Sequence, residues 1–205
     1  MKFNHKSNIW DKYANIWDNF VFKSYFNFIY KTSLKLIKKY LSDYKKILDI
    51  GCATGNFLYK TQKINKKLDL YGVDSSLNMI KIAKEKFKNI SFYNLKAEEI
   101  NFPENFFDII TLIETFHHLP NQKLVLEKIN KILKPEGIFL IVEPDLNNKI
   151  VKILINLMKN FKIEKESTFL KQEELIDLIE NFNFKKYQIS KSLGSIFLLF
   201  KNLKK

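Results

Sequence analysis

Arginine is absent from this sequence. The 35 cationic residues are all lysines, and together with 22 acidic residues they give a formal net charge of +13. Arginine usually supplies the bidentate phosphate and guanine contacts of nucleic-acid sites, and the abundance of asparagine, isoleucine and phenylalanine suggests AT-rich coding. We therefore attribute the lysine excess mainly to coding bias and to solvated helix faces. DNA is not expected as a partner, while contact with RNA or with an anionic membrane surface is left open but not favoured.

Cysteine, long apolar runs and linkers are also scarce. The single cysteine, Cys52, excludes an internal disulfide and a multi-cysteine metal site, and no metal is expected. No apolar run approaches the roughly 18 residues of a membrane span, and no apolar stretch follows the charges of residues 1–6 as a secretory signal requires. A chain of 205 residues without repeats suffices for one well-buried domain. We expect a single-domain cytoplasmic protein, either a monomer or a homodimer.

Short apolar runs alternate with segments of helical periodicity. Strands are expected at 46–50, 68–74, 90–95, 107–113 and 138–143, with helices at 57–62, 76–88, 122–133, 150–161 and 169–182. A helical pattern also covers about 10–41, and a turn is expected at 134–137. Two last strands, 185–189 and 195–200, are too close for a parallel crossover and must be antiparallel. The sequence predicts an α/β protein with a doubly wound, Rossmann-like, mostly parallel sheet and an antiparallel edge hairpin.

A glycine loop follows the first expected strand. Gly51 and Gly55 flank the segment 52–54, and the chain holds only five glycines. Glycine lets the backbone turn sharply and lets a ligand approach closely, and the next helix offers unpaired N–H groups. Asp74 ends the second strand, where a carboxylate can accept hydrogen bonds from ribose hydroxyls. Helix capping is the alternative role for this position, and the two are compatible if Ser76 caps the helix.

Four segments carry a family resemblance. They are Ile-Leu-Asp-Ile-Gly-Cys-Ala-Thr-Gly at 47–55, Tyr-Gly-Val-Asp at 71–74 followed by Ser76 and Met79, the fourth-strand segment 107–119, and the segment 133–143. Together, and in this order, they resemble class I S-adenosylmethionine-dependent methyltransferases, in the small-molecule branch that includes ubiquinone-biosynthesis enzymes. The resemblance implies S-adenosylmethionine as cofactor and a strand order of 3-2-1-4-5-7-6. It also implies a helical cap at 1–42, a cofactor core at 45–145, a substrate-covering insertion at 146–168 and a closing helix and hairpin at 169–205.

The resemblance also implies roles for individual residues. The cofactor residues that it implies are Asp49, Gly51, Cys52, Ala53, Gly55, Asp74, Ser75, Met79, Ala97, Glu98 and Glu114. The loop would approach the methionine moiety and Asp49 its amino group, Asp74 the ribose and Met79 the adenine. Backbone N–H groups at 97–98 would meet the adenine edge, and Glu114 would lie close to the methyl group.

Two positions depart from the family pattern. Ala53 stands where a third glycine is common, and if its φ is positive the alanine costs about 1 kcal/mol. Lys96 stands where many relatives have an aspartate before the Ala-Glu pair, which weakens the case for a side-chain bond to the adenine amino group.

The acceptor is less well defined. His117 and His118 are candidate general bases for a hydroxyl acceptor, although packing and local hydrogen bonds also account for them; His118, Tyr13 and Trp17 are candidate substrate contacts. The helix at 150–161 is apolar on more than one face. We therefore expect a small apolar or amphiphilic acceptor, such as a quinone precursor or a lipid.

The sequence is also compatible, to different degrees, with other functions. An RNA or protein methyltransferase and a non-catalytic S-adenosylmethionine-binding protein remain alternatives. A dinucleotide-dependent dehydrogenase is disfavoured because the chain lacks a Gly-x-Gly-x-x-Gly pattern and room for a catalytic domain.

Overall fold

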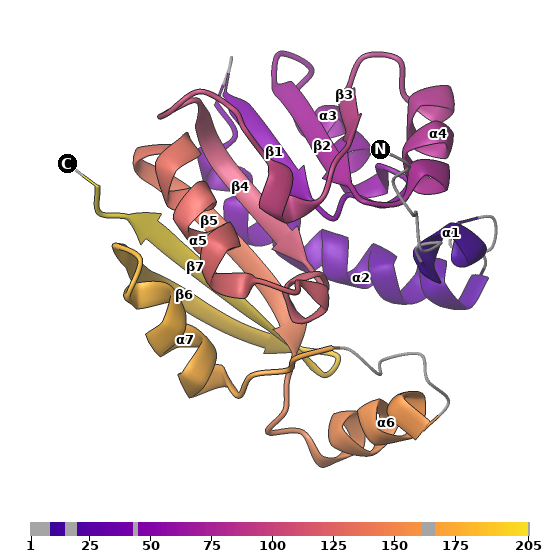
Figure 1. Cartoon of the computed structure of the whole chain (residues 1–205). Helices are drawn as coiled ribbons and strands as arrows, with labels where there is room; N and C mark the ends of the chain where they lie inside the picture. Colours follow the sequence, from indigo (N-terminus) through magenta and orange to yellow (C-terminus); the bar gives the residue numbers. More distant parts are fainter. Residues whose placement is uncertain (1–8, 15–19, 43–44, 161–166, 205) are drawn as a thin grey trace, which may run out of the picture. The chain divides into compact units, whose positions relative to one another are not determined.

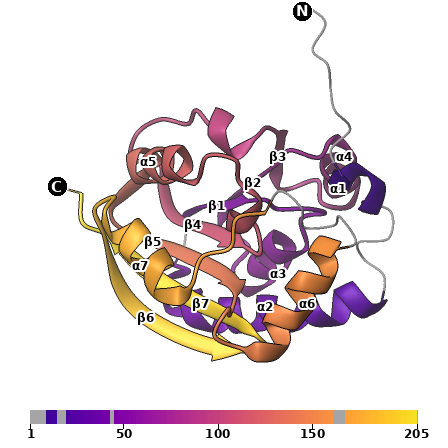
Figure 2. The same cartoon turned by 60° about the horizontal axis from the view of Figure 1, so that its bottom comes forward.

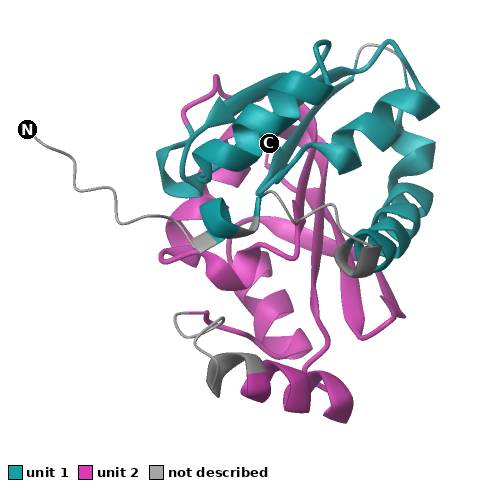
Figure 3. Cartoon of the chain, turned by 90° about the vertical axis from the view of Figure 1, so that its right-hand side faces the viewer, with its two compact units in different colours: residues 1–100 teal, residues 101–205 magenta. Residues whose placement is uncertain are grey.

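The computed structural model describes residues 9–14, 20–42, 45–160 and 167–204. The chain separates into two compact units, residues 1–100 and 101–205 (Figure 3). Within the described residues, no helix combines the length and the apolar character needed to cross a membrane.

The first unit contains a three-stranded parallel sheet. Its elements are α1 (Ile9–Tyr13), α2 (Phe20–Ile37), η1 (Lys38–Tyr40), β1 (Lys46–Ile50), α3 (Asn56–Ile64), β2 (Asp69–Asp74), α4 (Leu77–Lys86), β3 (Ser91–Asn94) and η2 (Ala97–Glu99) (Figure 1). Strand β2 pairs in parallel with β1 on one side and with β3 on the other. The last four residues of β1 are buried, as expected for a parallel strand covered on both faces. The carboxyl ends of the three strands therefore meet at one edge.

Helix α2 packs against α3. It buries a face formed by Ile29, Tyr30, Ser33 and Ile37, and the ring of Tyr30 lies 5.6 Å from that of Phe57 on α3. The helical pattern predicted over 10–41 thus contains two separate helices, with residues 15–19 outside the described part of the chain.

The second unit holds the remaining four strands. Its elements are β4 (Phe107–Ile113), η3 (Phe116–His118), α5 (Gln122–Ile132), β5 (Leu133–Pro144), α6 (Lys149–Asn160), α7 (Gln172–Glu180), β6 (Phe184–Ser192) and β7 (Ser195–Asn202) (Figure 1). Strands β4 and β5 are parallel, and β7 is antiparallel to both β5 and β6. Leu193 and Gly194 have φ of +46° and +77°, the left-handed pair that a tight two-residue hairpin requires. The lysine-rich β6 is mostly exposed, which protects an edge strand from further pairing.

Strand β5 begins earlier than predicted. The segment expected to be a turn, 134–137, becomes a bulge in the β4–β5 ladder: Phe107 pairs with Leu133, and the next pair is Ile109 with Ile138. The backbone bends at Glu136, which has a φ of +59°, and the pairing with β4 resumes after it. Along the whole sheet the strand order is β3-β2-β1-β4-β5-β7-β6. The predicted α/β class, strand order and antiparallel closing hairpin are confirmed.

Candidate functional site

The glycine loop after β1 is tied down by backbone hydrogen bonds. The N–H groups of Gly51 and Cys52 both donate to the carbonyl of Val73, at 2.8 and 3.0 Å, and the N–H of Gly55 donates to the carbonyl of Cys52 at 2.9 Å. Gly51 and Gly55 have φ of +75° and +80°, a conformation that glycine adopts without steric cost. The loop is therefore a defined turn against the end of β2.

At two positions in or near this loop, close packing leaves no space for a Cβ atom, so the residue must be glycine. A Cβ added to Gly55 would lie 2.6 Å from the ring of Phe92, and one added to Gly72 would lie 2.7 Å from Phe92 and 2.8 Å from Sγ of Cys52. Cys52 is accordingly buried, and burial, followed by the charges of Asp74 and Asp49, raises the pKa of its thiol well above the usual value. Cys52 is therefore a neutral packing residue of the loop at physiological pH.

Ala53 adopts the conformation that makes its departure from glycine costly. Its φ is +46°, for which a residue with a Cβ costs about 1 kcal/mol relative to glycine. Its methyl group is buried in a cluster with Ala14 and Met79, and Trp10 packs against the same cluster. Burial of the methyl group offsets part of the backbone cost.

Asp74 connects the end of β2 to both neighbouring segments. One carboxylate oxygen accepts the N–H of Ala53 at 2.9 Å, and the other accepts the N–H of Ser76 at 2.8 Å. The Asp74 carbonyl accepts the N–H of Leu95 at 3.1 Å. Since a carboxylate offers about four acceptor positions, each oxygen retains capacity for one hydroxyl donor.

The environment of Asp74 disfavours its charge. Burial raises the pKa of this carboxyl from 3.8 to about 6; the backbone donors Ser76 and Ala53 oppose the shift, and the nearby charge of Asp11 adds to it. A carboxylate that a polar ligand can stabilise by donating hydrogen bonds is expected at a binding site rather than at a purely structural position.

Helix α4 begins with two caps. Ser76 is the N-cap residue, and its hydroxyl accepts the N–H of Met79 at 3.2 Å. The same hydroxyl donates to Oδ1 of Asp11 at 2.6 Å, and this carboxylate oxygen also accepts the N–H of Asn78 at 3.1 Å. Asp11 thus fastens α1 to α4. Asp11 is not among the residues predicted from sequence, because no local pattern indicates a partner 65 residues away.

The remaining first-unit candidates lie at the same edge. Asp49 is buried near the end of β1, and Ala97 and Glu98 lie in η2 just beyond β3. Ser75 is exposed between β2 and α4. The structure therefore gathers the predicted first-unit residues at the carboxyl ends of β1, β2 and β3.

In the second unit, Glu114 directly follows β4. Its φ is +50°, an uncommon conformation for a residue with a side chain. Its N–H donates to the carbonyl of Val142 at 2.8 Å, and its carboxylate accepts the hydroxyl of Ser195 at 2.7 Å. Both contacts hold the side chain at the carboxyl end of β4.

Glu143, near the end of β5, organises the segment that carries the two histidines. Its carboxylate accepts the N–H groups of Thr115, Phe116 and His117 at 3.2, 2.9 and 3.3 Å. It also lies 2.6 Å from Nδ1 of His117. A carboxylate accepts and does not donate, so the Nδ1–H of His117 donates to Glu143. From the sequence, Glu143 is predicted only as the end of the strand 138–143, because its partners lie 26 to 28 residues away.

His118 has a different environment. Its Nδ1 lies 2.9 Å from the hydroxyl of Ser167. Burial, with a smaller contribution from His117, lowers the pKa of His118 to about 3. His118 is therefore a neutral imidazole at physiological pH and a weak base.

The side chains of two residues predicted to contact the substrate lie outside the part of the protein that the structure describes. Trp17 belongs to the undescribed segment 15–19. Tyr13 ends α1, but its side chain is not described. Their contact with an acceptor stays a prediction.

Comparisons with known proteins agree with this architecture. Residues 41–193 match the methyltransferase domain family. A carboxy-S-adenosyl-L-methionine synthase from Nautilia profundicola is 35% identical over 147 residues, which cover 65% of this chain and 61% of that protein. The ubiquinone/menaquinone biosynthesis C-methyltransferase UbiE from Campylobacter jejuni is 28% identical over 55% of this chain and 50% of its own length. A methyltransferase structure from Thermotoga maritima superposes with a TM-score of 0.77 at 17% identity, covering 94% of this chain and 98% of that one.

These matches define the class of protein as S-adenosylmethionine-dependent methyltransferases. Because the family match covers most of the sequence, the chain belongs to the methyltransferase domain family, and S-adenosylmethionine is its cofactor. The residues present fit this cofactor. Gly51 and Gly55 hold the left-handed turn at the carboxyl end of β1, and Asp74 keeps one acceptor position on each oxygen for the two hydroxyls of a ribose.

Proposed function

We propose that this methyltransferase transfers a methyl group to a small apolar or amphiphilic acceptor, such as a quinone precursor. When bound, the cofactor would supply a methyl group activated by a sulfonium: an aligned nucleophile of the acceptor would bond to the methyl carbon in line, and S-adenosylhomocysteine would leave as the thioether. The protein's contribution is then to hold the donor, to align the acceptor and to exclude water.

For the donor, we assign the polar contacts to the carboxyl ends of β1 to β3. Asp74 would accept the two ribose hydroxyls, because each of its oxygens keeps an acceptor position. Met79 is buried beside Ala53, and its contact with the adenine ring is what the family resemblance implies. The Gly51–Gly55 turn would face the methionine moiety, and Asp49 its amino group.

The observation that carries the acceptor proposal is the exposed face of α6. Ile150, Ile153, Leu154 and Leu157 follow one helical stripe and are 68%, 60%, 54% and 47% exposed, whereas Ile155 is buried. Val151 of α6 lies against Gly194 in the hairpin turn, next to the exposed Leu193. Figures 1 and 2 show α6 standing apart from α5 and α7 within this unit. Large exposed apolar patches usually mark contact with an apolar ligand or surface.

The named relatives support two reactions. A relative in ubiquinone and menaquinone biosynthesis favours an apolar acceptor. A relative named as a carboxy-S-adenosyl-L-methionine synthase favours a second candidate, in which the cofactor itself is modified. Mass spectrometry of the nucleoside product separates them: S-adenosylhomocysteine indicates methyl transfer, and a carboxylated sulfonium nucleoside indicates the second reaction.

Polar substitutions on the α6 stripe should impair use of an apolar acceptor. Loss of two apolar contacts in Ile153→Gln/Leu157→Gln is expected to raise the KM for a demethylquinone about tenfold, with binding of S-adenosylhomocysteine unchanged. Lys152→Gln on the same helix is the matched control. If turnover occurs only on small polar acceptors, and wild-type protein does not float with liposomes, the acceptor proposal fails.

The two histidines should behave differently in catalysis. If the acceptor is a hydroxyl compound, His117→Gln is expected to lower kcat by about a hundredfold, since a positioned base contributes at least this much. His118→Gln should leave kcat within about twofold, because a group with so low a pKa is a poor base. Turnover is measured with saturating cofactor on variants whose circular dichroism matches wild type. Equal rates for wild type and both variants would end the assignment of His117 as a base.

A further inference from the structure

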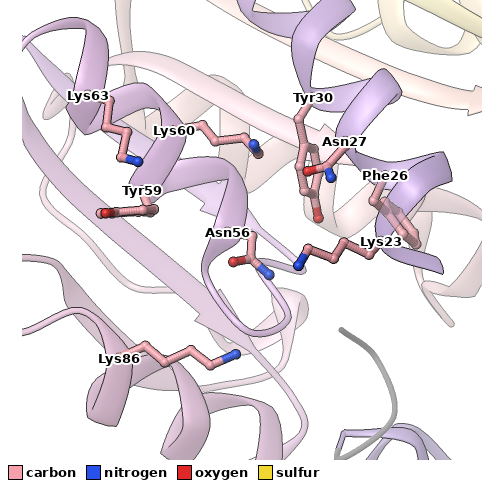
Figure 4. Close-up of a pocket in the computed structure, with 9 residues that line it drawn as sticks. All are labelled: Lys23, Phe26, Asn27, Tyr30, Asn56, Tyr59, Lys60, Lys63 and Lys86. Carbon is pink, nitrogen blue, oxygen red and sulfur yellow. The ribbon is translucent and has the colours of Figure 1, made fainter. Parts of the chain in front are cut away.

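A lysine-lined cavity occupies the first unit between α2 and α3. Its volume is about 510 Å³, and none of its nine described lining residues is acidic. Four of them are lysines: Lys23 from α2, Lys60 and Lys63 from α3, and Lys86 from the end of α4. Figure 4 shows the Lys23 side chain extending toward Asn56, with Lys86 on a different side of the cavity. We call this cavity the lysine pocket.

The pocket results from two facing helix surfaces. Asn56, Tyr59, Lys60 and Lys63 are spaced as one face of α3, and residues 23, 26, 27 and 30 are spaced as one face of α2. A purely solvating role would spread these ammonium groups into open water, whereas here they surround one cavity. Among the described residues, no carboxylate pairs with Lys23, Lys60 or Lys63. A cavity lined by one sign of charge concentrates counter-ions, so an anion is the ligand with matching charge.

The aromatic side chains that line the pocket favour some kinds of anion over others. The ring of Tyr59 stacks on Phe87, with centroids 4.5 Å apart and planes at 18°. Nζ of Lys63 lies over the Tyr59 ring, 4.6 Å from its centroid. Proteins that bind single-stranded nucleic acid offer aromatic faces on which bases stack. Tyr59 is already engaged by Phe87 and Lys63, and the other two lining rings, Phe26 and Tyr30, contact each other as well as Tyr25 and Phe57. The rings of the pocket therefore offer little stacking surface to a base.

We propose that the lysine pocket binds a small phosphorylated ligand with at least two negative charges, of the size of a diphosphate group. Lysine ammonium groups serve phosphate as point charges, and the amide of Asn27 adds a neutral donor on the same wall. The source of the phosphate is either a free phosphorylated metabolite or a lipid headgroup. This site is separate from the proposed donor contacts at Asp74.

Titration calorimetry with inorganic pyrophosphate at low salt tests the pocket. Lys60→Gln/Lys63→Gln is expected to weaken pyrophosphate binding at least about tenfold, and added salt should weaken wild-type binding. The matched control, Lys81→Gln/Lys84→Gln, removes the same charge from exposed positions of α4 outside the pocket and should change binding less than about twofold. All variants should bind S-adenosylhomocysteine like wild type, and only wild type and the control should gain thermal stability from pyrophosphate.

Several outcomes would overturn the proposal. Equal weakening in the two double variants would indicate diffuse net charge, and competition between pyrophosphate and S-adenosylhomocysteine would assign the cavity to the donor site. A short oligoribonucleotide that binds more tightly than pyrophosphate, through Lys60 and Lys63, would make the pocket a nucleic-acid surface. Flotation with phosphatidylglycerol vesicles identifies the source: capture of wild type and control but not of Lys60→Gln/Lys63→Gln supports a lipid phosphate, and no capture supports a free one.

Discussion

Replacement of Asp74 by asparagine is expected to weaken binding of S-adenosylhomocysteine about a hundredfold at neutral pH. Hydrogen bonds to a charged group contribute about 1.5–3 kcal/mol each, and loss of the charge from two ribose contacts therefore costs about 3 kcal/mol, or two orders of magnitude in Kd. The asparagine also presents an N–H group to a site where the N–H groups of Ala53 and Ser76 already converge. Titration calorimetry measures the change directly.

Asp69→Asn provides the matched control. Asp69 begins the same strand, is exposed, and accepts a hydrogen bond from the hydroxyl of Tyr71 at 3.0 Å. The substitution removes the same charge at the far end of β2 and should leave the Kd within about twofold. Equal effects of the two substitutions, or none at Asp74, would contradict the ribose assignment.

The raised pKa of Asp74 makes cofactor affinity and stability respond to pH in opposite directions. As pH falls through about 6, Asp74 becomes protonated, and affinity for S-adenosylhomocysteine should fall because a neutral carboxyl accepts hydrogen bonds less strongly. For stability, the folded protein keeps this proton to higher pH than the unfolded chain does. Its contribution is therefore full below the ordinary pKa near 3.8 and is lost as pH rises through about 6. Asp11→Asn removes a charge that raises the pKa and should move the affinity midpoint to lower pH.

Local patterns predicted most of the elements that position the donor site. The glycine loop directly follows the β1 run, and Ser76 directly precedes the helix that it caps, so Gly51 and Ser76 could each be placed from their local sequence. The closing hairpin followed from the short separation of its strands, and the structure adds the left-handed pair Leu193 and Gly194. The strand order, by contrast, came only from the family resemblance, because short apolar runs do not specify which strands pair.

Contacts between distant segments were beyond sequence reasoning. Asp11 and Ser76 are 65 residues apart, and His117 and Glu143 are 26 apart, so neither pair appears in any local pattern. The lysine pocket was hidden for the same reason. Its lysines read as ordinary solvated helix positions until α2 and α3 were placed side by side. From sequence, the cost of alanine at position 53 could be predicted only for the case of a positive φ. The structure shows that φ of Ala53 is +46°.

Glu143 should be among the residues whose removal most destabilises the fold. Its carboxylate accepts three backbone N–H groups from the segment after β4 and also contacts Nδ1 of His117, and it is only 5% exposed. Alanine would leave these donors without their acceptor in a largely dry environment, where each unsatisfied group costs about 1–3 kcal/mol. Allowing for partial access by water, we expect Glu143→Ala to lower the free energy of unfolding by about 4 kcal/mol.

Urea denaturation of a graded set of variants tests this role. Glu143→Gln keeps one acceptor oxygen for Thr115 and Phe116 but sets an N–H group against the N–H of His117, so about half the loss is expected. Glu136→Gln is the control: its side chain is 68% exposed and pairs with Lys201 at 3.2 Å, and such a surface pair contributes less than about 1 kcal/mol. Since a domain of this kind is stable by only about 5–15 kcal/mol, Glu143→Ala should shift the midpoint visibly. A loss no larger than that of Glu136→Gln would mean that water replaces the carboxylate, and that other contacts hold His117 in place.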